Sequence, residues 1–587
     1  MLKKTRQTLN ILFVFVIINN LPLLAQPVAG TDELGRTLIQ SNLAGKLQKD
    51  KYVAVFYFLT HGDGTAEDYW DLSEIIPNHP EVLNDYNNAY WGKPVYYEGG
   101  PCPNYYWGKP LYGYYRADDY WVTLKSVQLL TDAGVDILVI DATNGSTYPD
   151  RADLLMRAMD EVRAQGKNPP KIVFYTNTES GKRMEEAYQN FYKTGAKYYH
   201  PDCWFLIDGL PLIIGLSKEA AGLDYEKKFT FRESQWPTER YKTNSWPWIE
   251  FTRPQCVHYN NKGEREIISV SVAQHPNPKA GMGGSAFYGN KDNWGRSYHN
   301  GQPGNPAKDI AYGYNIQEQW DFAIKEQPKF IFVTGWNEWT AGRWTSKDGN
   351  MEHSWFCDLA SPEYSRDIEP TLTAGIKDNY YMQLVNNIRR FKGVEANPLP
   401  SAIKTIKDFS DWSEVAPGYK DYIHDTQARN WKGAQTKPET VYTNFTGRND
   451  FEVLKIARDG NNIYFYAQTV DNITANTGDN WMCVYLDVDR NYKTGWNGYD
   501  YRIAEGNRLQ KYSGSDWVDE HRVKYYVKEN KLMITVARSY IPEFASFLNF
   551  EFKWSDNMQN TNNPLDWYLN GDAAPGGRFN WIYSEKE

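Results

Sequence analysis

Between Lys51 and Gly393, short runs of β-branched and aromatic residues alternate with stretches whose apolar residues recur at helical spacing. The apolar runs predict strands, and the amphipathic stretches predict helices. Expected strands cover Tyr52–Leu59, Leu111–Tyr115, Asp136–Ile140, Lys171–Tyr175, Phe229–Arg232, Trp248–Phe251, Ile267–Val272 and Phe330–Thr334. Expected helices cover Tyr120–Ala133, Arg151–Gln165, Arg183–Tyr192 and Ile316–Lys325.

The order of these elements predicts an α/β fold built on a parallel sheet. Strands that are apolar throughout and alternate with helices are buried on both faces. Repeated βα units over residues 51–393 fit a (β/α)8 barrel with long loops. A doubly wound sheet is the alternative, but no Gly-rich phosphate loop follows the first expected strand.

Two long inserts interrupt the alternation. The first, Gly62–Lys109, is crowded with Tyr, Trp, Gly and Pro and contains most of two copies of YWGKP, at Tyr90–Pro94 and Tyr106–Pro110. The second, Pro276–Ala307, is rich in Gly, Asn and Pro. Both would follow strands, and loops that follow barrel strands lie on the face where active sites are built.

The pattern changes near Lys392–Pro400. Short alternating strands separated by Asn, Asp and Gly turns follow, which is typical of an antiparallel β-sandwich. These expected strands are Asn462–Val470, Trp481–Val488, Tyr499–Ile503, Arg522–Val527 and Lys531–Ala537. A chain of 587 residues is too long for one core. We therefore expect a barrel domain over residues 26–398 and a sandwich over 402–587.

Composition narrows the choice of partner. The formal net charge of −9 argues against nucleic acid or an anionic membrane, since both attract cationic surfaces. Aromatic residues make up 16% of the chain, with 22 Trp and 44 Tyr. Most of them are expected in the core, but aromatic rings in a cleft also suit the C–H faces of sugars. A glycan is the partner this composition favours, and a monomer is expected.

The N-terminus predicts export. Lys3, Lys4 and Arg6 form a basic region, an apolar run covers Ile11–Ile18, and small Ala25 precedes Gln26. This pattern is typical of a secretory signal peptide over residues 1–25, which places the protein in the periplasm or outside the cell. A membrane anchor is the alternative, but the apolar run is short for a bilayer and no other long apolar segment exists.

Catalytic residues of a barrel lie just past the strand ends, so polar residues at these positions are the candidates. The polar residues at these positions are His61, Asp63, Asp141, Asn177, Glu179, Glu233, Glu250, His275 and Glu338. Glu338 lies in GWNEWTAG, where Trp336, Asn337 and Trp339 flank it. Burying a carboxylate among aromatic rings is costly without hydrogen bonds, which favours a working role for Glu338. Asp141 could equally cap the following helix.

The stretch FVTGWNEW resembles the WNEW motif of glycoside hydrolase family 99 and its WbsX-like relatives, and WFLIDGLPLIIGL at Trp204–Leu216 resembles another of their segments. The resemblance covers residues 50–390. It implies a (β/α)8 barrel acting on α-linked glycans, with Glu338 as a catalytic carboxylate. The family's acid/base carboxylate follows three residues later, where this chain has Ala341.

A different residue must then supply the second carboxylate, which glycosidases place about 5–10 Å from the first. Asp141 is the first choice because it ends a neighbouring buried strand. Asp367 and Glu369 in YSRDIEP are the next, although Arg366 beside them suits an ion pair.

The C-terminal region resembles a family 9 carbohydrate-binding module over Val484–Ile503. Within it, Asp487, Asp489 and Asn491 alternate at a spacing that can place oxygen ligands around Ca²⁺. The terminal Glu of an EF-hand is missing, so a plain turn is the alternative. No cofactor is expected for catalysis. Trp412, Trp431 and Trp496 are candidates for sugar stacking or for the core.

Three functions remain open. The first is an endo-acting glycoside hydrolase on a polysaccharide, using Glu338 and Asp141 with His61, Asp63, Glu233, His275, Trp336, Asn337 and Trp339 around the substrate. The second is a glycan-binding protein that does not cleave, which Ala341 favours. The third is a lyase on the same scaffold, which would use a Tyr or His base.

Overall fold

The computed structural model describes residues 27–62, 70–83, 88–91, 104–276, 293–344, 355–356, 361–434, 439–478 and 480–585. The predicted signal peptide, Asp63, Cys102 and Cys357 lie outside these ranges. Among the described residues, Cys203, Cys256 and Cys483 are free thiols. No helix in the described ranges is long and apolar enough to cross a membrane.

The first half of the chain forms a nearly closed sheet that is mostly parallel. Its parallel strands are β2 (Tyr52–Tyr57), β5 (Ile137–Asp141), β6 (Lys171–Tyr175), β8 (Leu210–Gly215), β9 (Thr230–Gln235), β10 (Ser245–Pro247), β12 (Arg265–Ser271) and β13 (Phe330–Thr334). Neighbours in chain order pair with one another except β10 and β12, and β13 pairs with β2. Between β10 and β12 lies β11 (His258–Tyr259), antiparallel to β12. The backbone N–H of Asn244, the residue before β10, donates to the carbonyl of Tyr259 in β11 at 2.9 Å. This hydrogen bond joins the two edges of the sheet.

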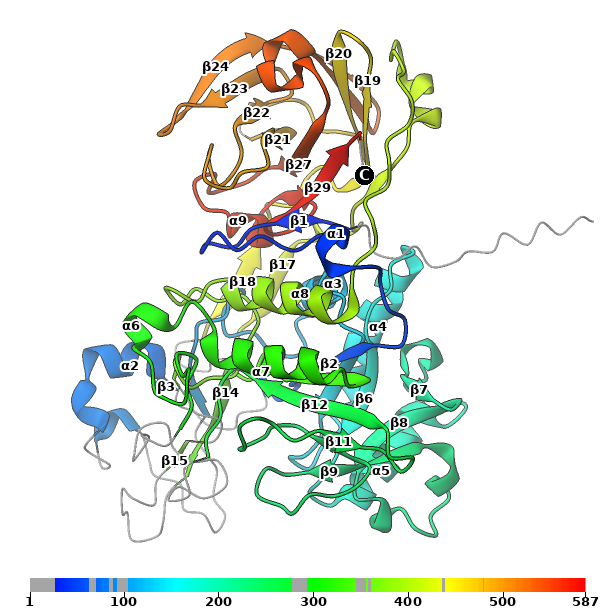
Figure 1. The fold of residues 1–587 in the computed structure, drawn as a ribbon, viewed down its shortest axis with the longest axis vertical. Helices are drawn as coiled ribbons and strands as arrows, with labels where there is room; N and C mark the ends of the chain where they lie inside the picture. Colours follow the sequence, from blue (N-terminus) through cyan, green and yellow to red (C-terminus); the bar gives the residue numbers. More distant parts are fainter. Residues whose placement is uncertain are drawn as a thin grey trace, which may run out of the picture.

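Both faces of the sheet are buried, as the apolar strands predict. One face forms an inner core that includes Phe56, Val139, Tyr175 and Phe332. The other face packs beneath helices that run along the outside (Figure 1). The main helices of this half are α3 (Tyr120–Asp132), α4 (Pro149–Ala164), α5 (Ser180–Ala187), α7 (Tyr314–Glu326) and α8 (Asn379–Lys392).

Two expected strands need correction, and one strand was not expected. Leu111–Tyr115 forms turns and not a strand, because its Tyr side chains pack individually into the core. The fourth parallel strand is β8, the second arm of an antiparallel hairpin with β7 (Leu206–Ile207) inside the segment that resembles family 99. The strand expected at Trp248–Phe251 lies earlier in the chain, as β10.

A smaller sheet follows directly from β13. It has the order β15 (Trp355–Phe356), β14 (Thr340–Trp344), β4 (Asn104–Tyr106), β3 (Trp70–Asp71). Residues of the first long insert therefore lie beside the chain that leaves β13, on the side of its carboxyl end. Short helices α1 (Ser41–Ala44), α2 (Leu72–Asn78) and α6 (Pro306–Asp309) complete this half.

The C-terminal half consists of antiparallel sheets (Figure 1). One has the order β16 (Tyr419–Lys420), β19 (Phe451–Arg458), β20 (Asn462–Thr469), β26 (Lys531–Ala537), β25 (Lys524–Lys528). The other contains β29 (Phe579–Ser584), β27 (Asn549–Asp556), β21 (Cys483–Asp487), β22 (Tyr501–Ala504), β23 (Arg508–Tyr512) and β24 (Trp517–Arg522), with β28 (Asp572–Ala574) beside β27. The pair β17 (Arg429–Lys432) and β18 (Val441–Asn444) and helix α9 (Asp566–Leu569) lie between the halves.

The two halves share contacts at several points. Strand β1 (Ala29–Gly30), from the start of the described chain, pairs antiparallel with β29 at its end. Arg429 forms an ion pair with Asp119 at 2.8 Å, with both side chains buried. Arg578 pairs with Asp378 at 2.6 Å, also buried. A single apolar cluster extends through both halves. The division at residues 398–402 stays a prediction.

Candidate functional site

Glu338 lies four residues beyond the end of β13, at the carboxyl end of the parallel sheet. Its side chain is 12% exposed and accepts a hydrogen bond from Arg366 Nη2 across 2.7 Å. A charge-assisted bond of this kind fixes the carboxylate while leaving part of it open to solvent. Glu338 is therefore both oriented and accessible.

Arg366 connects Glu338 to two further residues. Its guanidinium is fully buried, and Nη1 lies 3.3 Å from Nδ1 of His275, which follows β12. The same guanidinium lies over the ring of Trp248, 5.3 Å from its centroid. The sequence placed Arg366 beside Asp367 and Glu369, but its ion pair is with Glu338, because the backbone N–H of Gly335 bonds the Arg366 carbonyl and aligns the two segments. No sequence signal singled out Trp248 as a binding residue.

Asp141 ends β5 and shares the inward face with Val139, so it points into the sheet's interior at the carboxyl end. It is 1% exposed. One oxygen accepts from the backbone N–H of Thr143 and the other from Asn144 Nδ2, each at 3.0 Å. These bonds hold the turn after β5. Asp141 does not cap the following helix, because the N-cap residue of α4 is Tyr148.

The remaining WNEW residues form a buried cluster. Asn337 accepts from the Phe58 N–H at 2.9 Å and donates to the Phe58 carbonyl at 3.2 Å, which ties the chain after β13 to the end of β2. The His61 ring stacks on Trp339 at 4.3 Å, and its Nε2 lies 2.7 Å from the Asn337 carbonyl. Burial lowers the pKa of His61 to about 3, so its ring is neutral near pH 7. The indoles of Trp336 and Trp339 are both 0% exposed, so neither ring offers a face to a ligand here.

Asp367 and Glu369 carry buried carboxyl groups, and that of Asp367 lies beside the backbone of Glu338. Burial raises the pKa of Asp367 to about 6, although Arg296 and Arg366 oppose the shift and the backbone N–H of Glu338 hydrogen-bonds it. Burial, together with Asp367, raises the pKa of Glu369 well above its usual value. Tyr115 donates to Glu369 at 2.9 Å and accepts from Asn337 at 3.1 Å. This chain of bonds links the buried carboxyls to the WNEW segment.

Other candidates lie elsewhere. β9 extends to Gln235, so Glu233 lies within the strand; it pairs with Gly215 on the outward face and accepts from Ser217. Glu233 therefore does not face the interior with Asp141. Glu250 is buried and bonds His258 at 2.8 Å. Glu179 is exposed and pairs with Arg183 and Lys182. Asp63 is outside the described residues.

Ala341, at the position of the family's second carboxylate, lies in β14 opposite Tyr105. It packs against an apolar cluster made by Leu72, Val82, Tyr105 and Trp107. Among the described residues, the side chain of Ala341 therefore contacts apolar neighbours.

In the C-terminal half, Asp487 and Asp489 come together with Asp500, with one oxygen of each within 4.8 Å of the others. Asn491 instead shapes the turn, since its backbone N–H donates to Asp489 at 2.9 Å and to Asp487 at 3.2 Å. Burial and the neighbouring Glu551, Asp500 and Asp489 raise the pKa of Asp487 to about 8. Asp500 lies directly before the adjacent strand β22, and the local spacing of Asp487, Asp489 and Asn491 could not reveal it.

No protein-family model matches the chain, and no curated protein matches it. Among solved structures, it is similar to the GH99 endo-alpha-mannosidase from Bacteroides thetaiotaomicron, at 15% identity and a TM-score of 0.33 over 59% of this chain and 98% of that one. The same enzyme in complex with bis-tris-propane gives 13% identity and a TM-score of 0.32 over the same shares. Likeness at this level does not transfer an activity to this chain.

Proposed function

We propose that this chain is an exported glycoside hydrolase that acts on a polysaccharide at the carboxyl end of a (β/α)8 barrel, with a C-terminal sandwich that binds glycan. The observation that carries the proposal is Glu338, a partly exposed carboxylate beyond β13 that Arg366 holds across 2.7 Å. The WNEW resemblance favours an α-linked substrate.

In this proposal Glu338 acts as the charged carboxylate, with Arg366 as its ion-pair partner. Hydrolysis also needs a group that carries a proton near neutral pH. Asp141 on the inward face of β5 is one choice. Asp367 is the other, because its pKa of about 6 keeps a proton available and the Glu338 backbone N–H contacts it.

The alternative is a glycan-binding protein that does not cleave. It is favoured by Ala341, which packs into an apolar cluster where the family resemblance expects an acid. The two functions differ in what they require of Glu338. Cleavage needs a carboxylate that exchanges a proton or forms a bond, whereas binding alone does not.

The test is incubation of the mature chain with a panel of α- and β-linked polysaccharides, followed by chromatographic sizing of the products. We expect one polymer to yield shorter fragments, and Glu338→Gln to lower turnover by about 10³-fold while binding survives. Glu326→Gln is the matched control, because Glu326 also pairs with an arginine, at 2.9 Å, but at the opposite end of β12. Retention of a glycan without cleavage would support the binding alternative, and failure to bind any polymer would reject both.

A further inference from the structure

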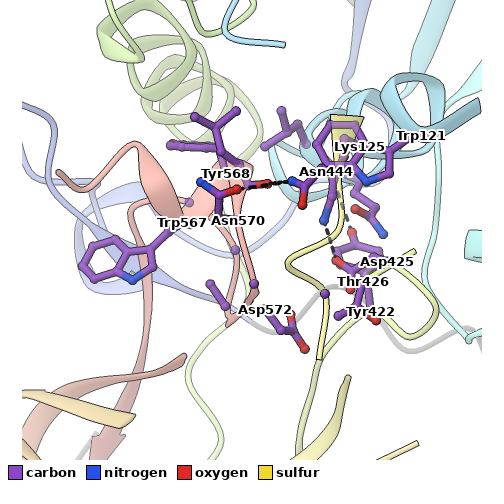
Figure 2. Close-up of a pocket in the computed structure, with 18 of the residues that line it drawn as sticks. Trp121, Lys125, Tyr422, Asp425, Thr426, Asn444, Trp567, Tyr568, Asn570 and Asp572 are labelled. Atoms are coloured by element: carbon purple, nitrogen blue, oxygen red, sulfur yellow. Dashed lines mark hydrogen bonds and ion pairs between the residues drawn. The ribbon is translucent and has the colours of Figure 1, made fainter. Parts of the chain in front are cut away.

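A cavity lies between α3 and the C-terminal half, far along the chain from the WNEW segment. Its lining comes from α3, from the loop that follows β16, from β18 and from the segment around α9 and β28. Figure 2 shows Lys125 of α3 contacting Asp425, with Asp572 in the same pocket. The cavity volume is about 40 Å³, which is enough for an ion with water.

Three carboxylates converge beside this cavity. Asp425, Asp450 and Asp572 each place one oxygen within 4.8 Å of the other two. They come from three segments: the loop after β16, the residue before β19, and the first residue of β28. Carboxylate oxygens at this mutual distance form the kind of ligand set that hard divalent cations prefer.

Each carboxylate is held in place by a donor on one oxygen. Asp425 Oδ2 accepts from Lys125 at 3.0 Å, Asp450 Oδ2 from the His424 N–H at 2.7 Å, and Asp572 Oδ2 from the Phe451 N–H at 2.6 Å. The backbone and Lys125 thus fix the orientation of all three groups before any ligand arrives. Such pre-organisation is what a metal site requires.

Oxygens beside these donors have no protein partner. In the part of the chain that the structure describes, Oδ1 of Asp425 and Oδ1 of Asp450 are buried without a hydrogen bond. Oδ2 of Asp421 is also without one; this side chain lines the same cavity and is only 7% exposed. A buried carboxylate oxygen without a hydrogen-bond partner is unfavourable, so these atoms indicate a ligand.

Acidic side chains outnumber basic ones around this cavity. The carboxyl groups that interact here are those of Asp132, Asp421, Asp425, Asp450 and Asp572, and the facing ammonium groups are those of Lys125, Lys167 and Lys553. These carboxyl groups outnumber the ammonium groups five to three, and a divalent cation would offset the excess.

We propose that Asp425, Asp450 and Asp572, with Asp421 beside them, bind a calcium ion at the junction of the two halves. Ca²⁺ fits better than Mg²⁺, because it accepts irregular sets of carboxylates with water, whereas Mg²⁺ demands near-octahedral geometry. The ion would connect the loop after β16, β19 and β28, and through Lys125 it would fix α3 against them. The proposal is independent of the glycosidase function and of the Asp487, Asp489 and Asp500 cluster.

The test is calorimetric titration of the EDTA-treated full-length chain with CaCl₂. We expect a site with a Kd between about 10⁻⁷ and 10⁻⁴ M, and a higher midpoint of thermal unfolding when Ca²⁺ is present. Asp450→Asn should abolish this site or weaken it at least about tenfold. Asp489→Asn is the matched control: it removes one carboxylate from the other acidic cluster and should leave the site intact.

If Asp450→Asn does not fold, a crystal of the unaltered chain grown with millimolar CaCl₂ tests the site directly. We expect a calcium peak among Asp425, Asp450 and Asp572. Binding that Asp489→Asn removes and Asp450→Asn retains would overturn the proposal. So would a crystal without a peak at this position, or titration heats no different from buffer.

Discussion

Arg366 is fully buried, yet it donates across 2.7 Å to Glu338, a residue 28 positions earlier whose carboxylate still reaches solvent. Its second terminal nitrogen faces His275 at 3.3 Å. One guanidinium therefore positions groups that follow two adjacent strands, β12 and β13. This places Arg366 at the centre of the candidate site.

Replacing Arg366 by Met should destabilise the protein and disturb the site. Removing one partner of a buried ion pair typically costs about 3–5 kcal/mol, and the low end applies because Glu338 can reach water. Urea unfolding measures the stability, and the polysaccharide assay measures turnover. Arg265→Met, which breaks the exposed pair with Glu326, should change stability by less than about 1 kcal/mol. Equal losses in the two variants would contradict the central role of Arg366.

Asp367 should make the protein less stable as pH rises from about 4 to 6. Its pKa in the folded state is about 6, above the value of about 3.8 that applies when unfolded, so the unfolded chain loses its proton first. The stability lost across this window is on the order of 3 kcal/mol. Asp367→Asn keeps the neutral form and should flatten this part of the pH–stability curve. An unchanged curve would show that Asp367 ionises normally.

Substitution of Asp367 distinguishes the two candidates for the general acid, Asp367 and Asp141. If Asp367 delivers the proton, kcat/KM should fall as pH rises above about 6, and Asp367→Asn should lose turnover by about 10²–10⁴-fold. If Asp141 delivers it, Asp141→Asn should show that loss and Asp367→Asn should retain activity. Binding of the polymer to each variant is the control for folding.

His61 should make the protein less stable as pH falls, whereas Asp367 should make it less stable as pH rises. Its folded pKa of about 3 lies below the usual 6.5, so the unfolded chain takes up the proton first as pH falls. Stability should therefore be complete above about pH 6.5 and decline by up to about 1.4 kcal/mol per pH unit below it. His61→Phe retains the stacking on Trp339 and should make this decline shallower. The measurement is urea unfolding at several pH values, and an unchanged slope would argue against a neutral, buried His61.

Asp119 joins the two halves of the chain. It caps α3 through the Val122 N–H and pairs with Arg429 at 2.8 Å, with both side chains buried. Asp119→Ala should cost about 3–5 kcal/mol, since it leaves a buried guanidinium without its partner. Asp118→Ala, in the neighbouring residue, removes a partly exposed pair with Arg116 and an exposed hydrogen bond from Trp431, and should cost only about 1 kcal/mol. Similar losses in both variants would mean that the Arg429 contact does not hold the halves together.

Much of the fold could be predicted from the sequence because its signals are local. Apolar runs such as Lys171–Tyr175 and Phe330–Thr334 appear as strands with these bounds, since continuous burial on both faces demands them. Placing Asp141 and Glu338 at strand ends followed from the same pattern. Leu111–Tyr115 was misinterpreted because buried Tyr residues in turns resemble a strand when only composition is visible.

The sequence alone determined the alternation of strands and helices, the change to antiparallel sheets, and Glu338 as the leading candidate. The tertiary structure decided which side chains meet. Arg366 pairs with Glu338 and not with the acids beside it, Asp500 joins Asp487, and Asp425, Asp450 and Asp572 converge from three segments. The reason is physical: hydrophobic periodicity is a property of neighbouring residues, whereas ion pairs and ligand sets depend on the register and packing of elements far apart in the chain.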